Sequence, residues 1–121
     1  MSRKNLTGVC ISVAGAALLA SGVQANAHHS FALFDMTKSV MLEGTVKQFD
    51  WTNPHSWIRL VVVNASNMPE EWMIELPAAG TLAREGWNKN YLKPGERISV
   101  RINPLKDGKK GGALQSFSPG T

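Results

Sequence analysis

The chain has 121 residues, a formal charge of +4 and one cysteine, Cys10. This length allows a single domain. One cysteine excludes an intramolecular disulfide framework, so a hydrophobic core must stabilise the fold. A positive charge of this size does not by itself indicate a nucleic-acid-binding protein.

The first 27 residues have the layout of a secretory signal peptide. Arg3 and Lys4 precede an uncharged run rich in alanine and glycine, which closes on the small-residue triplet 25–27. The strongly apolar part of this run is shorter than the ~20 residues that a transmembrane helix needs. We therefore expect cleavage after Ala27, export to the periplasm and no membrane attachment of the mature chain. Cleavage leaves 94 residues and lowers the formal charge to +2.

Residues 28–121 are predicted to form one β-rich domain. It begins with an arm, residues 28–38, whose Phe31 and Phe34 can pin it to the rest. Alternating apolar and polar side chains then predict half-buried strands. These strands run over residues 39–51, 57–63, 70–76, 97–102 and 113–118.

Residues 77–86 break the alternation and are predicted to form a short helix. Pro77 suits the first turn of a helix, and Gly86 suits its C-terminal cap. Gly44 lies among the inward-facing residues of the first strand, which indicates a bulge or a sharp bend. The order of elements and the bent first strand predict a small, mainly β, OB-like five-stranded Greek-key barrel with the helix between strands three and four. An antiparallel sandwich and an open meander use the same strands and remain alternatives.

Five segments taken in order resemble a known family. They are AHHSFALFD, LEGTVKQFDWTNPHSWIRL, EWMIEL, LAREGW and LKPGERISVRINPLKDG. The family is domain-of-unknown-function family 6152, a group of small periplasmic bacterial proteins. The resemblance covers nearly all of residues 28–121, and the segments most typical of the family, His28-His29-Ser30 and Asn53-Pro54-His55, are intact. It implies export and a small β-rich domain, but supplies no activity.

The three histidines, His28, His29 and His55, are the predicted metal ligands. Cleavage after Ala27 makes His28 the first residue, so its α-amine and imidazole can chelate one cation. A further imidazole from His29 or His55 completes a nitrogen-rich site, which suits copper(II) best among the divalent first-row metals. The alternative is that His28 and His29 simply follow the signal peptide and that His55 caps a turn.

The second predicted site consists of Trp51, Asn53 and Trp57, at the turn that follows the first strand. Two tryptophans that bracket a turn can line a groove for a protein partner or a small ligand, while burial in the core is the alternative. Nucleic acid is not expected as a partner, because the mature chain carries only +2 and is exported.

No catalytic motif is present: the sequence lacks a nucleophile elbow, a His-Glu-x-x-His motif, a P-loop and a dinucleotide fingerprint. We therefore predict an exported, non-enzymatic binding domain that holds copper or another divalent metal at the mature N-terminus. The alternative is a metal-free interaction module that binds its partner at the Trp51/Trp57 face.

Overall fold

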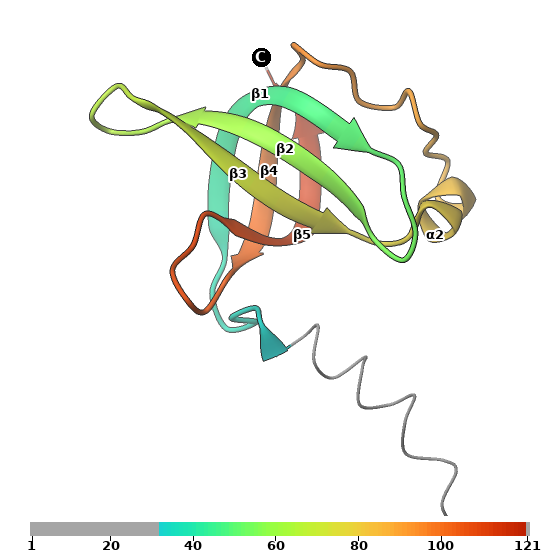
Figure 1. The fold of residues 1–121 in the computed structure, drawn as a ribbon, viewed down its shortest axis with the longest axis horizontal. Helices are drawn as coiled ribbons and strands as arrows, with labels where there is room; N and C mark the ends of the chain where they lie inside the picture. The colour runs from blue at the N-terminus through green and yellow to red at the C-terminus, as the bar shows by residue number, and fades with distance from the viewer. Residues whose placement is uncertain (1–31, 121) are drawn as a thin grey trace, which may run out of the picture.

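A computed structural model describes residues 32–120. These residues form five strands and a short helix (Figure 1). The elements, in chain order, are β1 (Val40–Asp50), β2 (Ser56–Val63), β3 (Pro69–Leu76), α2 (Ala79–Arg84), β4 (Arg97–Pro104) and β5 (Gly111–Pro119). The predicted signal peptide, residues 1–27, and the first four residues of the predicted arm lie outside the described residues.

The strands form one closed barrel in the order β1-β2-β3-β5-β4. β1 closes it, because its first half pairs with β4 and its second half with β2, both antiparallel. β3 and β5 pair in parallel over three residue pairs, from Met73–Gly111 to Glu75–Ala113. Helix α2 lies beside the β1–β2 loop, at the far end of the barrel from the β2–β3 hairpin (Figure 1). This arrangement confirms the predicted OB-like barrel and excludes the sandwich and the open meander.

The core is built from alternate residues of the strands, because successive side chains of a strand point to opposite faces. Leu82 of α2 and Leu92 of the following connection join the same cluster. The buried strand residues are Leu42, Val46, Ile58, Leu60, Ile74, Leu76, Ile98, Val100 and Ile102. They confirm the inner faces that alternation predicts for the first four strands.

β1 carries a close approach and an irregularity at two different residues. A Cβ on Gly44 would collide with the carbonyl oxygen of Val61 in β2, so only glycine fits there. The register between β1 and β2 shifts between Val46 and Gln48. The bulge in β1 therefore lies further along the strand than Gly44. It directly follows Val46, whose amide donates a hydrogen bond to the carbonyl of Glu96, next to the start of β4.

The side chain of Asn64 organises the β2–β3 hairpin. Its Oδ1 accepts hydrogen bonds from the amides of Ser66 (2.9 Å) and Met68 (3.0 Å). Its Nδ2 donates to Oε1 of Glu70 (2.8 Å), and this bond is the main reason that the pKa of Glu70 is lowered. A fixed loop sets the register of the hairpin, so the pairing continues without a slip to Ser56 and Leu76.

None of the helices within residues 32–120 combines the length and the hydropathy that spanning a membrane requires.

Candidate functional site

His55 lies at the end of the β1–β2 loop, and hydrogen bonds within that loop hold its backbone. The hydroxyl of Thr52 donates to the carbonyl of His55 at 2.6 Å. The amide of Thr52 donates to Oγ of Ser56, and this hydroxyl donates back to the carbonyl of Thr52, both at 3.2 Å. The loop is also attached to the residues after β3, because the amide of Ala79 donates to Thr52 at 3.1 Å. The position of the imidazole is therefore set by a well-bonded loop.

The imidazole of His55 contacts the carboxylate of Glu75, with Nδ1 3.2 Å from Oε1. The register explains this contact. Glu75 lies directly opposite Trp57 in the β2–β3 pair, and His55 precedes Trp57 by two residues, so it is diagonal to Glu75 on the same face. The side chain of His55 is 40% exposed and that of Glu75 only 13%. Of the two tautomers of a neutral imidazole, a carboxylate beside Nδ1 favours the one with its proton on that nitrogen, and this tautomer has its lone pair on Nε2.

His55 and Glu75 supply the ionisable groups of a cavity of about 300 Å³. It lies where the parallel ladder between β3 and β5 ends, after the pair Glu75–Ala113. The other lining residues are apolar: Phe34, Leu76, Pro77, Ala113 and Leu114. An apolar cavity with a few converging polar groups is the usual form of a small-ligand site.

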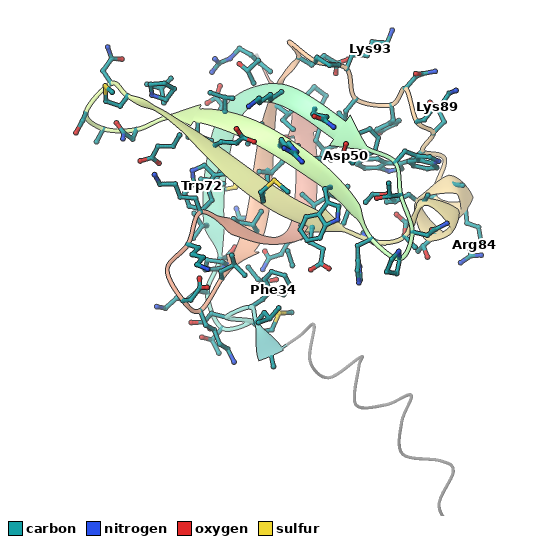
Figure 2. All side chains as sticks on the ribbon, viewed as in Figure 1. Phe34, Asp50, Trp72, Arg84, Lys89 and Lys93 are labelled. Atoms are coloured by element: carbon teal, nitrogen blue, oxygen red, sulfur yellow. The ribbon has the colours of Figure 1, made fainter. Side chains whose placement is uncertain are left out.

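The arm reaches this cavity through Phe34, which is 6% exposed and is labelled in Figure 2. The backbone around it is attached to the end of β4 and the following loop. Asp35 donates its amide to the carbonyl of Pro104 (2.8 Å), and Lys106 donates to that of Leu33 (2.9 Å). The chain around Phe34 is thus attached to the barrel, while Phe31 lies outside the described residues.

Acidification is expected to loosen the turn that follows Phe34. Thr37 donates to Oδ1 of Asp35 from its hydroxyl (2.6 Å) and from its amide (3.0 Å), and these bonds lower the pKa of Asp35. Because the pKa is depressed in the folded state, the stabilisation is complete above the unfolded value and is lost as the pH falls through the folded one. The amide resonance of Thr37 should therefore titrate below pH ~4.

The matching control is Asp35→Asn, in which the Thr37 resonance should no longer titrate in that range. A Thr37 titration with its midpoint above the ordinary pKa of an aspartate would contradict the assignment of the lowered pKa to these two hydrogen bonds.

The outer face of β1, β2 and β3 carries a mixed charge network around Trp57. Nζ of Lys47 lies 2.7 Å from Glu71, and this hydrogen bond is the main reason that the pKa of Glu71 is lowered. Arg59 lies between two carboxylates, with Nε 3.6 Å from Asp50 and Nη1 3.9 Å from Glu71. Acidic and basic groups are therefore interspersed on this face.

The structure does not bring the three predicted ligand-binding residues together. Trp51 packs on the core side of the sheet, with its ring 6.0 Å from that of Phe49, which pairs with the buried Ile58. Trp57 follows the opposite face, and Asn53 is exposed in the loop, next to a cis bond to Pro54. That these residues bind a partner stays a prediction, but Trp51 and Trp57 do not form one face.

Trp51 instead belongs to an aromatic cluster beside α2. Trp87 stacks on Tyr91 with ring centroids 4.1 Å apart, and its ring lies 6.1 Å from Phe49 and 5.7 Å from Phe117. All but Tyr91 are partly buried against the core. These rings therefore extend the core at the helix end of the barrel.

Of the predicted metal ligands, only His55 lies within the described range; His28 and His29 lie outside it. Residues 32–120 contain no group of three or more His, Cys, Asp and Glu side chains able to hold a metal ion. Ser56, beside His55 in sequence, is fully buried and hydrogen-bonded to Thr52, so its hydroxyl is not available as a nucleophile.

The chain resembles known proteins in sequence and in fold. The sequence pattern of a family of unknown function, DUF6152, matches residues 16–115. A crystal structure of the mitochondrial single-stranded DNA binding protein Rim1 from S. cerevisiae has a similar fold, with a TM-score of 0.52 and 7% identity. The similarity covers 68% of this chain and 92% of that one. No curated protein matches the sequence.

Proposed function

Since the chain belongs to the DUF6152 family, whose function is unknown, we propose a function from the site itself: an exported, non-enzymatic binding domain that holds copper between the mature N-terminus and His55. One observation carries the proposal. Phe34 and His55 line the same cavity, so the arm runs to the imidazole that the metal requires.

Chain length permits the remaining contact. His28 lies six positions before Phe34, and six residues span at most about 20 Å. The amine and imidazole of His28 are thus within reach of Nε2 of His55. If the arm joined the barrel far from His55, six residues would be too short to bring His28 to its imidazole.

Glu75 supports the assignment of His55 as a ligand. Histidine ligands commonly direct their second nitrogen to a carboxylate, which orients the ring and makes it a stronger donor. Nδ1 of His55 already lies 3.2 Å from Glu75. The α-amine and two imidazoles then supply the nitrogen donors that copper(II) prefers, and they bind after release of their protons.

Copper titration of the exported protein tests the proposal. Mass spectrometry first establishes that the chain starts at His28. Electron paramagnetic resonance should then show one tetragonal, nitrogen-rich copper(II) site. We expect His55→Ala to change the spectrum and lower the affinity, and Glu75→Gln to lower the affinity about tenfold through the orientation of His55.

Asp107→Asn is the matched control for Glu75→Gln, because Asp107 is an exposed carboxylate of the β4–β5 loop. It should leave the affinity unchanged. Equal affinity in a chain with one extra residue before His28 would exclude the terminal amine. An unchanged spectrum and affinity in His55→Ala would exclude the imidazole.

The second candidate is a metal-free module that binds a protein partner or a small ligand. The cavity of about 300 Å³ favours it, since its lining is mainly apolar. Failure of copper to bind the correctly processed chain would leave this candidate.

A further inference from the structure

Trp57 occupies the centre of the outer face of β1, β2 and β3. Asp50 of β1 lies directly opposite on one side and Glu75 of β3 on the other. His55 and Arg59 lie two residues before and two residues after Trp57 along the chain, so their side chains are on the same face as Trp57. The half-buried indole is thus surrounded by two carboxylates, an imidazole and a guanidinium.

These neighbours fix one another and keep further polar atoms for a ligand. His55 lies against Glu75 at 3.2 Å, and Nε of Arg59 lies 3.6 Å from Asp50. That Nε is buried and has no hydrogen-bond partner within residues 32–120. The His55–Glu75 pair also holds Nε2 and Oε2 beyond the two atoms in contact. Oδ1 of Asp50 already accepts a hydrogen bond from Nε2 of Gln48.

We propose that this surface binds an uncharged oligosaccharide, with Trp57 as the platform for one sugar ring. A pyranose with equatorial hydroxyls presents axial C–H groups on its face and hydroxyls at its edge. The C–H face packs on the amphipathic indole. The hydroxyls donate to Asp50 and Glu75 and accept from Arg59.

The charge of the face decides the class of ligand. OB-type barrels bind oligonucleotides or oligosaccharides at the face of their second and third strands. A phosphate backbone requires a cationic surface, whereas Asp50, Glu71 and Glu75 outnumber Lys47 and Arg59 here. Single-stranded nucleic acid also stacks on successive aromatic rings.

The outer face offers only one such ring among the described residues of β1, β2 and β3. Trp72 and Phe49 of these strands pack against the core instead. A single platform with planar polar neighbours fits one sugar ring and its hydroxyls.

Titration with cellohexaose and with chitohexaose, both uncharged, tests the inference by NMR. The indole N–H resonances of the four tryptophans are the probes. We expect the resonance of Trp57 to shift, with those of Trp51, Trp72 and Trp87 unchanged. Trp57→Ala should weaken binding by about tenfold or more, and Trp57→Phe should weaken it less. Oligothymidylate should leave the Trp57 resonance unmoved.

Val63→Ala is the matched control, because Val63 lies on the same strand and face at the hairpin end and is 60% exposed. It should bind the sugars normally. If Trp57→Ala does not fold, Arg59→Gln replaces it and should weaken binding several-fold. The inference is wrong if neither sugar shifts the Trp57 resonance at millimolar concentration, or if oligothymidylate alone shifts it.

This site shares His55 and Glu75 with the proposed metal site, so each proposal is tested at a position that the other does not use. Copper affinity should be unchanged in Trp57→Phe, and sugar binding should be unchanged in the chain with an extra residue before His28. Failure of one proposal is therefore distinguishable from failure of the other.

Discussion

Replacement of Gly44 by alanine is expected to destabilise the barrel by about 3 kcal/mol, near the upper end of the cost of overpacking. The new Cβ would collide with the carbonyl oxygen of Val61 and lie 3.1 Å from its carbonyl carbon. Both are backbone atoms of β2, so they cannot move aside as a flexible side chain does. Urea denaturation followed by tryptophan fluorescence measures the loss as a lower midpoint at an unchanged slope.

Gly80 provides the matched control. It lies in α2, and a Cβ there would have no atom within 4 Å. Gly80→Ala should therefore leave stability unchanged or raise it by up to about 1 kcal/mol through helix propensity. Equal stability of Gly44→Ala and the wild-type chain would show that β1 and β2 separate there at little cost.

Leu60→Ala should destabilise the barrel by about 3 kcal/mol, which is within the usual cost of replacing a buried leucine by alanine and leaving a cavity. Leu60 is fully buried and pairs with Val46 on one side and Trp72 on the other. The same urea experiment measures the loss. Val63→Ala, on the exposed end of the same strand, should change stability by less than about 0.5 kcal/mol.

The two substitutions can be combined, because Cγ of Leu60 lies 3.0 Å from the Cβ that alanine would add at Gly44. The closest atom, however, belongs to the Val61 backbone. Shrinking Leu60 should therefore not rescue Gly44→Ala, and the double variant should be less stable than either single variant. A rescue would show that the leucine side chain, and not the backbone, causes the strain.

Alternation predicted the inner faces correctly, because the two-residue period of a strand depends only on local sequence. Ile58 and Leu60 face inward wherever β2 is placed in the barrel. The partners of a strand are not local, and the parallel pairing of β3 with β5 does not follow from this pattern.

Gly111 shows why the last strand was predicted too short. Glycines after a lysine-rich segment indicate a loop, yet Gly111 begins β5. A Cβ there would lie 2.9 Å from the carbonyl oxygen of Met73 and 2.9 Å from Cδ1 of Leu105. The missing side chain is needed for close approach to β3, and that requirement is visible only once the strands are paired.

The contact between His55 and Glu75 could have been predicted from the sequence. A loop centred on Ser66 between β2 and β3 places Trp57 opposite Glu75, which brings His55 diagonal to the carboxylate. The cavity could not be predicted from the sequence, because its lining residues Phe34, Pro77 and Leu114 come from three separate parts of the chain.

Because the cavity depends on the parallel pairing of β3 with β5, the two proposed binding surfaces are also expected to form at different stages of folding. The platform around Trp57 comes from neighbouring antiparallel strands, whose pairing is local and needs little loop closure. The cavity is lined by Leu76 and Leu114, which come together only when β3 and β5 pair. That pairing spans three residue pairs and requires closure of the long chain segment between the two strands. A chain in which β1, β2 and β3 have formed a meander already carries the platform, whereas the cavity is completed with the barrel.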